Sequence, residues 1–106
     1  MIVYISGKIT GDPDYRLKFG GYQLTLEAAG HTVLNPALNP PGLSNVDYMR
    51  LSFAAMEAAE VVAFLPDWSS SKGAMVERAW CQYVGKPTCM VADLLPAHAA
   101  AALRKL

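Results

Sequence analysis

The chain has 106 residues, and its nine basic and nine acidic residues cancel to a formal net charge of zero. This length fits a single domain over residues 1–106 with a real hydrophobic core, since 53% of the residues are apolar. A neutral chain lacks the electrostatic footprint of a protein that binds a nucleic-acid polymer, and no apolar run reaches the roughly 18 residues of a membrane span. We therefore expect a small-molecule ligand, no nucleic-acid polymer and no membrane.

The first half of the chain is predicted to form a strand, a helix and a second strand. Residues 1–5 are apolar as in a central parallel strand, and the apolar period predicts a helix that begins at Tyr15 and ends at Gly30. Residues 31–34 form the second predicted strand. The proline-rich segment 35–43 suits neither a helix nor a central strand, so it is predicted to be a loop at a strand's carboxyl end.

The second half begins with a helix over 46–59, which Ser44 is predicted to cap, with Asp47 at its third position. Apolar side chains lie on two lines of this helix, so we expect burial on two sides and a homodimer or higher homo-oligomer. The remaining predicted elements are a strand over 61–65, a loop over 66–72, a helix over 73–85, a strand over 87–91 and a helix over 96–106.

Strands that alternate with helices form right-handed βαβ crossovers. We therefore predict a three-layer α/β fold with a small parallel sheet of roughly four to five strands, helices on both faces, and a flavodoxin- or Rossmann-like topology. The loops that follow the first three strands then lie at one edge of the sheet, which is where such folds bind small molecules.

The cysteines and histidines show no metal-binding pattern. Cys81 and Cys89 lie in no CxxC or Cys/His spacing, and His31 and His98 have no ligand partners at metal spacing. Because the sequence shows no signal peptide, we expect both cysteines to be reduced thiols in a cytoplasmic protein. We predict no metal and no cofactor.

The strongest functional signal lies in the loop and helix that follow the third strand. The Glu77 side chain should lean back over Ala74 and Gly73, so that nothing bulky covers its carboxylate. Asp67 in the loop is expected to reach the same space, so two carboxylates and the aromatic Trp68 are predicted to face one cavity. Three structural alternatives stay open: Glu77 as a surface ion-pair partner, Asp67 as a loop cap, and Trp68 packed under the loop.

Four segments resemble the nucleoside 2-deoxyribosyltransferase superfamily, close to its short bacterial and phage domains of unassigned function. They are IVYISG at 2–7, GHTVLNP at 30–36, LPDW at 65–68 and GAMVE at 73–77, so the resemblance covers nearly the whole chain. It implies a retaining mechanism, in which a glutamate attacks the anomeric carbon of the sugar and forms a covalent glycosyl-enzyme.

Carried over by position, the resemblance makes Glu77 the nucleophile, Asp67 the acid or base-contacting carboxyl, and Tyr4 the hydroxyl that orients Glu77; Tyr4 as a mere core residue is the open alternative. The residues expected to bind substrate are Ser6, Gly7, Lys8, Asn35, Ser52, Trp68, Ser69, Ser71 and Gly73. Two positions depart from the family pattern: Ser52 stands where an Asp is common, and Lys8 where many relatives have proline.

The sequence thus predicts an N-glycosidase or 2-deoxyribosyltransferase-like enzyme that acts on a nucleoside or a nucleoside 5′-monophosphate. Serines 69–71 and the backbone N–H groups around Gly73 are predicted to hold the 5′-phosphate, with Lys8 or Lys72 nearby as a cation. A flexible loop that merely caps the following helix is the open alternative for these residues. The alternative is a catalytically weak or inactive nucleotide-binding module of the same fold, for which Ser52 is the main support.

Overall fold

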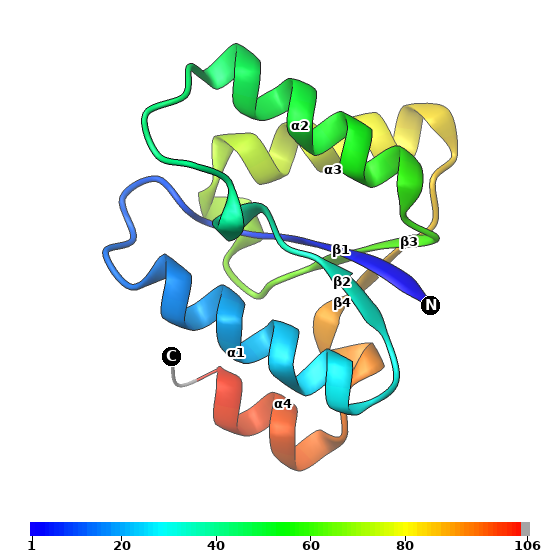
Figure 1. Ribbon diagram of the computed structural model, residues 1–106. Helices are drawn as coiled ribbons and strands as arrows, with labels where there is room; N and C mark the ends of the chain where they lie inside the picture. Colours follow the sequence, from blue (N-terminus) through cyan, green and yellow to red (C-terminus); the bar gives the residue numbers. More distant parts are fainter. Residues whose placement is uncertain (105–106) are drawn as a thin grey trace.

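The computed structural model describes residues 1–104, in which four strands alternate with four α-helices. These elements are β1 (Ile2–Ser6), α1 (Tyr15–Ala28), β2 (Thr32–Leu34), α2 (Asn45–Ala58), β3 (Val61–Phe64), α3 (Lys72–Val84), β4 (Thr88–Met90) and α4 (Ala97–Leu103). All strand pairs are parallel, and the strand order is β2-β1-β3-β4. This is the predicted three-layer, flavodoxin-like α/β fold (Figure 1).

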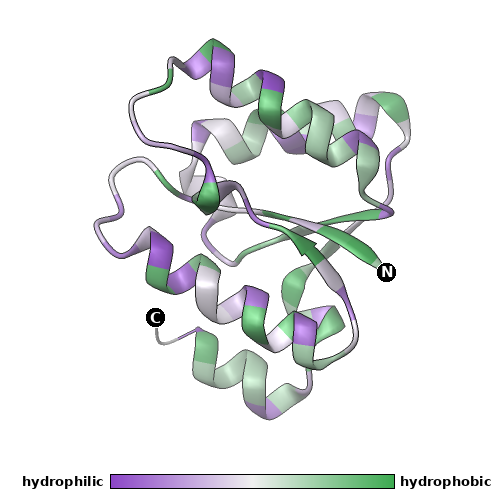
Figure 2. Cartoon of the chain, viewed as in Figure 1, coloured by the Kyte–Doolittle hydropathy of each residue, from purple (hydrophilic) through white to green (hydrophobic). Residues whose placement is uncertain are grey.

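The sheet has a hydrophobic core on each face. Val3 and Ile5 of β1 pack with Phe19 and Leu26 of α1 on one face, where α1 and α4 lie side by side (Figure 1). The alternate residues of the strands, among them Tyr4, pack on the other face, beneath α2 and α3. Figure 2 shows the hydrophobic residues concentrated on the strands. The two faces therefore meet different helices, and this difference decides where each side chain of β1 points.

Hydroxyl side chains cap the two helices nearest the candidate site. Ser44 Oγ accepts from the Asp47 N–H at 3.1 Å and donates to Asp47 Oδ2 at 3.0 Å, as predicted. Ser71 Oγ accepts from the Ala74 N–H at 3.1 Å and caps α3, which begins one residue earlier than predicted, at Lys72. At its other end, α3 terminates in the left-handed Gly85, with φ of 77°.

The outer surface of α2 differs from the prediction of burial on two sides. Ser52 and Met56 are its buried residues, whereas Val46 is 60% and Leu51 is 44% exposed in the isolated chain. The apolar line that contains Leu51 and Ala58 is therefore only partly covered within residues 1–104, whereas the line that contains Phe53 and Met56 packs against the sheet.

The two cysteines are free thiols on opposite faces of the sheet, Cys81 with the core beneath α3 and Cys89 with the core beneath α1. Within residues 1–104, none of the helices combines the length and the apolar character that crossing a membrane requires.

Candidate functional site

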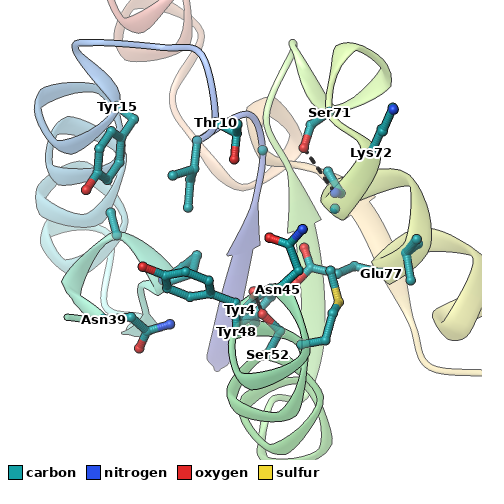
Figure 3. A pocket seen from close by; sticks show the side chains of 18 of the residues that line it. Tyr4, Thr10, Tyr15, Asn39, Asn45, Tyr48, Ser52, Ser71, Lys72 and Glu77 are labelled. Atoms are coloured by element: carbon teal, nitrogen blue, oxygen red, sulfur yellow. Dashed lines mark hydrogen bonds between the residues drawn. The ribbon is translucent and has the colours of Figure 1, made fainter. Parts of the chain in front are cut away.

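A cavity of about 620 Å³ opens at the carboxyl edge of the sheet. Its walls come from β1 and the loop after it, the segment after β2, and the N-terminal halves of α2 and α3 (Figure 3). This is the predicted edge, and its size falls in the range of small-molecule sites.

Glu77 lies in the wall of this cavity, and two hydroxyl groups hold its carboxylate. The Tyr4 hydroxyl donates to Oε2 at 2.6 Å, and Ser6 Oγ donates to Oε1 at 2.6 Å. Tyr4 and Ser6 are two residues apart on β1, so both point to the same face of the sheet, toward α3. The Glu77 side chain is only 6% exposed. One strand thus presents a hydroxyl to each oxygen of one buried carboxylate.

Burial dominates the acid–base behaviour of this pair. It raises the pKa of Glu77 above its ordinary value, although the hydrogen bonds from Ser6 and Tyr4 act in the opposite direction. Burial, together with the charge of Glu77, also raises the pKa of Tyr4 well above its ordinary value. Tyr4 therefore stays protonated at neutral pH and remains a donor to Glu77.

Ser52 of α2 extends this network by one step. Its Oγ lies 3.1 Å from the Tyr4 hydroxyl, and its side chain is buried at the cavity wall. A phenol has only one proton to donate, and the nearby carboxylate of Glu77 is the stronger acceptor. When Tyr4 donates to Glu77, Ser52 must donate to the Tyr4 oxygen, so the hydrogen bonds run from Ser52 to Tyr4 to Glu77.

Asp67 does not line the cavity. Its Oδ2 lies 2.5 Å from Lys18 Nζ and its Oδ1 accepts from the Lys8 N–H at 3.1 Å, while Lys18 also pairs with Asp12 at 2.5 Å. Lys18 belongs to α1, on the opposite face of the sheet from α3, and it is 8% exposed. The expectation that Asp67 and Glu77 face one cavity is therefore wrong, because a buried lysine holds the Asp67 carboxylate on the other side.

Trp68 also lies outside the cavity wall. Its ring packs edge-on to Phe64, with 5.8 Å between centroids, and the guanidinium carbon of Arg78 lies 4.8 Å from the ring centroid. The packing alternative for Trp68 is therefore the one that the structure supports.

Four other predicted residues do not line the cavity, and each has a different environment. Ser6 is fully buried and donates to Glu77. Asn35 Oδ1 accepts from the Ala37 N–H at 2.8 Å and its amide donates to Gln23 at 2.9 Å. Lys8 binds Asp67 and Lys18 through its backbone. Ser69 is exposed.

Gly7, Ser71 and Gly73 do line the cavity. A Cβ at Gly7 would lie 2.7 Å from Leu65 Cδ1, so the close approach of this loop to Leu65 requires glycine. The first N–H groups of a helix have no partners inside it. Ser71 Oγ accepts from one of them, and those of Lys72 and Gly73 remain at the cavity wall. Figure 3 shows the hydrogen bond of Ser71 at this end of the cavity.

Several residues of the wall were not predicted from the sequence, above all Tyr15 and Tyr48. Tyr15 is the first residue of α1, and Tyr48 lies in the first turn of α2, where its hydroxyl donates to the Pro40 carbonyl at 3.0 Å. A helix that follows a parallel strand begins at the carboxyl edge of the sheet, so its first-turn side chains surround the site. That position was the available signal, although both tyrosines also fit an apolar helix face.

Within residues 1–104, no group of three or more His, Cys, Asp or Glu side chains is arranged to hold a metal ion. Comparisons with curated proteins and with solved structures gave no match. A family described as a domain of unknown function, DUF4406, matches residues 1–90, which include all four strands and every cavity residue described above. The chain therefore belongs to the DUF4406 family.

Proposed function

We propose that this chain is an N-glycosidase or 2-deoxyribosyltransferase-like enzyme that acts on a nucleoside or a nucleoside 5′-monophosphate, with Glu77 as nucleophile. The observation that carries the proposal is a buried carboxylate in a cavity wall whose two oxygens accept from Tyr4 and Ser6. A helical glutamate usually pairs with a cation, yet within residues 1–104 Glu77 forms no ion pair. Hydroxyl donors orient the carboxylate without neutralising it, and each oxygen keeps a lone pair for attack.

The proposed reaction has two steps at the anomeric carbon. A Glu77 oxygen bonds to C1′ while the bond from C1′ to the base nitrogen breaks and its electron pair leaves with the base. Water or a second base then attacks C1′, the ester bond breaks, and Glu77 regains its charge. Tyr4 and Ser6 hold the carboxylate in place through both steps, because rotation of the side chain would break both hydrogen bonds.

The N-terminus of α3 supports the phosphate part of the proposal. Ser70, Ser71, Lys72 and Gly73 line this end of the cavity. Free N–H groups at a helix N-terminus favour an anion, and Lys72 supplies a positive charge. A phosphate bound there puts the sugar near Glu77, one turn along the same helix.

The base would then extend toward the aromatic side chains of the opposite walls. Tyr15 of α1 and Tyr48 of α2 line the cavity, whereas Trp68 does not (Figure 3). A tyrosine ring can stack on any nucleobase, because every base has a π face. We therefore propose these two tyrosines for the role that Trp68 had in the prediction.

One observation favours a second candidate, a nucleotide-binding module without turnover. Retaining glycosidases use two carboxyl groups that flank the scissile bond. Here the second predicted carboxylate, Asp67, is paired with Lys18 and lies outside the cavity wall. A chain that binds the nucleotide but cannot break the glycosidic bond would fit the same cavity.

Release of free base from a panel of nucleosides and their 5′-monophosphates, followed by chromatography, tests the proposal. Glu77→Gln should lose at least about a thousandfold in rate, since it removes the nucleophile but little volume. Glu57→Gln, at an exposed position on the same face of the domain, is the matched control and should keep full activity.

Thermal shifts with the same panel separate the two candidates. A ligand that binds only the folded chain raises its melting temperature. Stabilisation of the wild type without any release of base would support the binding module, and neither stabilisation nor release would refute both candidates.

The proposal includes self-association and a cytoplasmic location. Exposed apolar side chains of α2 and α3, among them Leu51 and Val76, support a homo-oligomer, because a dimer interface would cover them. The free thiols of Cys81 and Cys89 support a reducing compartment.

A further inference from the structure

Glu77 is the only acidic residue, within residues 1–104, that lines the cavity. Asp67 pairs with Lys18 on the other side of the sheet edge, and Asp12 pairs with the same lysine. If Glu77 acts as nucleophile, as proposed above, the cavity has a nucleophile but no second carboxyl group to protonate the departing base.

The other ionisable side chains of the wall are already occupied or badly placed for that proton transfer. Tyr4 donates to Glu77, and Tyr48 donates to the Pro40 carbonyl. Figure 3 shows the amine of Lys72 directed away from Glu77. Tyr15 lies on the opposite wall, where its ring is proposed to stack on the base, and a stacked ring cannot also place its hydroxyl at a nitrogen lone pair in the plane of that base. A general acid must lie within hydrogen-bond reach of the atom it protonates.

The lack of a proton donor restricts which bases can leave. A neutral base that departs without a proton takes up the negative charge that Glu77 loses to the ester, and an unprotonated base anion is costly in a site shielded from water. A base that is already cationic departs as a neutral molecule. It needs no proton, and its positive charge is attracted to Glu77 and to the tyrosine rings before the bond breaks.

We propose that the substrates are nucleoside 5′-monophosphates with a cationic base, such as a pyridinium ring or an N7-alkylated purine. A Glu77 oxygen bonds to C1′, the bond from C1′ to the ring nitrogen breaks, and its electron pair neutralises the ring. The carboxylate charge disappears in the ester at the same moment. Water then bonds to C1′, the ester electron pair returns to Glu77, and the proton of the water passes to solvent.

This inference rests on the proposed function and restricts its substrate class. The charges along the cavity agree with it. Lys72, the cationic side chain of the wall, lies at the phosphate end, whereas the Glu77 end has a carboxylate and hydroxyl groups. A substrate that is negative at its phosphate and positive at its base matches this distribution.

Guanosine 5′-monophosphate and N7-methylguanosine 5′-monophosphate form a matched pair, which differs by one methyl group and one positive charge. Nicotinamide mononucleotide and uridine 5′-monophosphate form a second pair with smaller bases. Release of free base is followed by chromatography, and Glu77→Gln provides the blank for spontaneous hydrolysis of the cationic compounds. We expect kcat/KM to be at least about a hundredfold higher for the cationic member of each pair, the size of effect that a general acid otherwise supplies.

The pH dependence gives a second readout. With a cationic substrate, kcat/KM should rise as Glu77 ionises and then stay level across neutral pH, where Tyr4 stays protonated, because no acid has to protonate the departing base. A bell-shaped profile would overturn the inference. Equal rates for neutral and cationic members, with both abolished by Glu77→Gln, would also overturn it and leave the proposed function standing. No release from any member of the panel would refute the proposed function and the inference with it.

Discussion

Two carboxylates at the same edge of the sheet have opposite environments. Asp67 is bound to a lysine and a backbone N–H, with its side chain 30% exposed, whereas Glu77 is almost fully buried and bound to hydroxyl groups. An ion pair neutralises a carboxylate and fixes it in the fold. Hydroxyl donors leave the charge in place at the cavity wall. The difference separates a carboxylate that joins two loops from one that is available to react.

The largest expected effect compares the two carboxylates by activity. Asp67→Asn should change kcat/KM by less than about tenfold, because the amide keeps the volume and the residue lies outside the cavity. Glu77→Gln should lower it by at least about a thousandfold. Steady-state kinetics on the nucleotide panel measures both. Similar large losses of kcat/KM in the two variants would show that Asp67 is also needed for catalysis, and would contradict the division of roles between the two carboxylates.

The next effect concerns stability at the Asp67 site. Lys18→Met removes the cation that Asp12 and Asp67 share and leaves Asp67 without its partner. We expect the free energy of unfolding to fall by about 2–3 kcal/mol, toward the low end for a broken buried pair since Asp67 is partly exposed. Urea denaturation measures it, with Lys72→Met at an exposed position as control. An unchanged midpoint for Lys18→Met would show that the ion pair contributes nothing to stability.

Lys18 also shows what the sequence analysis overlooked. The apolar line of α1 contains Tyr15, Phe19, Tyr22 and Leu26, and Lys18 stands three residues after the first of these and four before the third. A lysine on the buried face of an amphipathic helix requires a buried counter-charge. A loop carboxylate could meet that requirement. The sequence could therefore have predicted that Asp67 pairs with Lys18 and does not face the cavity.

Other features were predictable because a single local rule decides them. The apolar strands and the Ser44 cap follow from side-chain pattern alone. The position of Glu77 in the cavity wall, beside Gly73 and Ala74, agrees with the backward lean of helical side chains. The orientation of Trp68 was not predictable, since it depends on the short 3₁₀ turn Trp68–Ser70 and on contacts with Phe64 and Arg78.

Burial of Glu77 should also affect the free energy of unfolding. Replacement of Glu77 should raise this free energy, whereas Lys18→Met should lower it. The pKa of Glu77 is raised in the folded chain, so the folded state binds more protons than the unfolded state between the ordinary and the raised value. The free energy of unfolding therefore falls as pH rises through that window, by about 1.4 kcal/mol per unit of pKa elevation. Glu77→Gln removes this loss and should be the more stable protein at neutral pH.

Denaturation of the wild type and Glu77→Gln at a series of pH values tests this expectation, because the other titrating groups cancel in the difference. The difference should favour the variant increasingly as pH rises above the ordinary value of a glutamate. A variant less stable than the wild type at neutral pH would show that the Glu77 charge stabilises the fold and is not kept at a cost for function.

The smallest expected effect concerns the phosphate end of the cavity. Gly73→Ala adds a methyl group whose nearest neighbour, Met49 Cε, lies 3.4 Å away, so the flexible methionine can accommodate it. The methyl group nevertheless obstructs an anion at the adjacent N–H groups. We expect a loss of about tenfold in the preference for a 5′-monophosphate over its nucleoside, since charge-assisted hydrogen bonds contribute about 1.5–3 kcal/mol each. Calorimetry with both ligands measures this preference. An unchanged preference would show that the phosphate does not bind at the N-terminus of α3.

Mass spectrometry of a trapped intermediate tests most directly whether Glu77 is the nucleophile. A substrate with a 2-fluoro sugar slows hydrolysis of the glycosyl-enzyme, and trypsin then releases the peptide Gly73–Arg78, in which Glu77 is the only side-chain carboxylate. The account predicts that this peptide gains the mass of one glycosyl unit after reaction with the wild type. An enzyme that releases base while this peptide stays unmodified, or that carries the adduct on another residue, would contradict it.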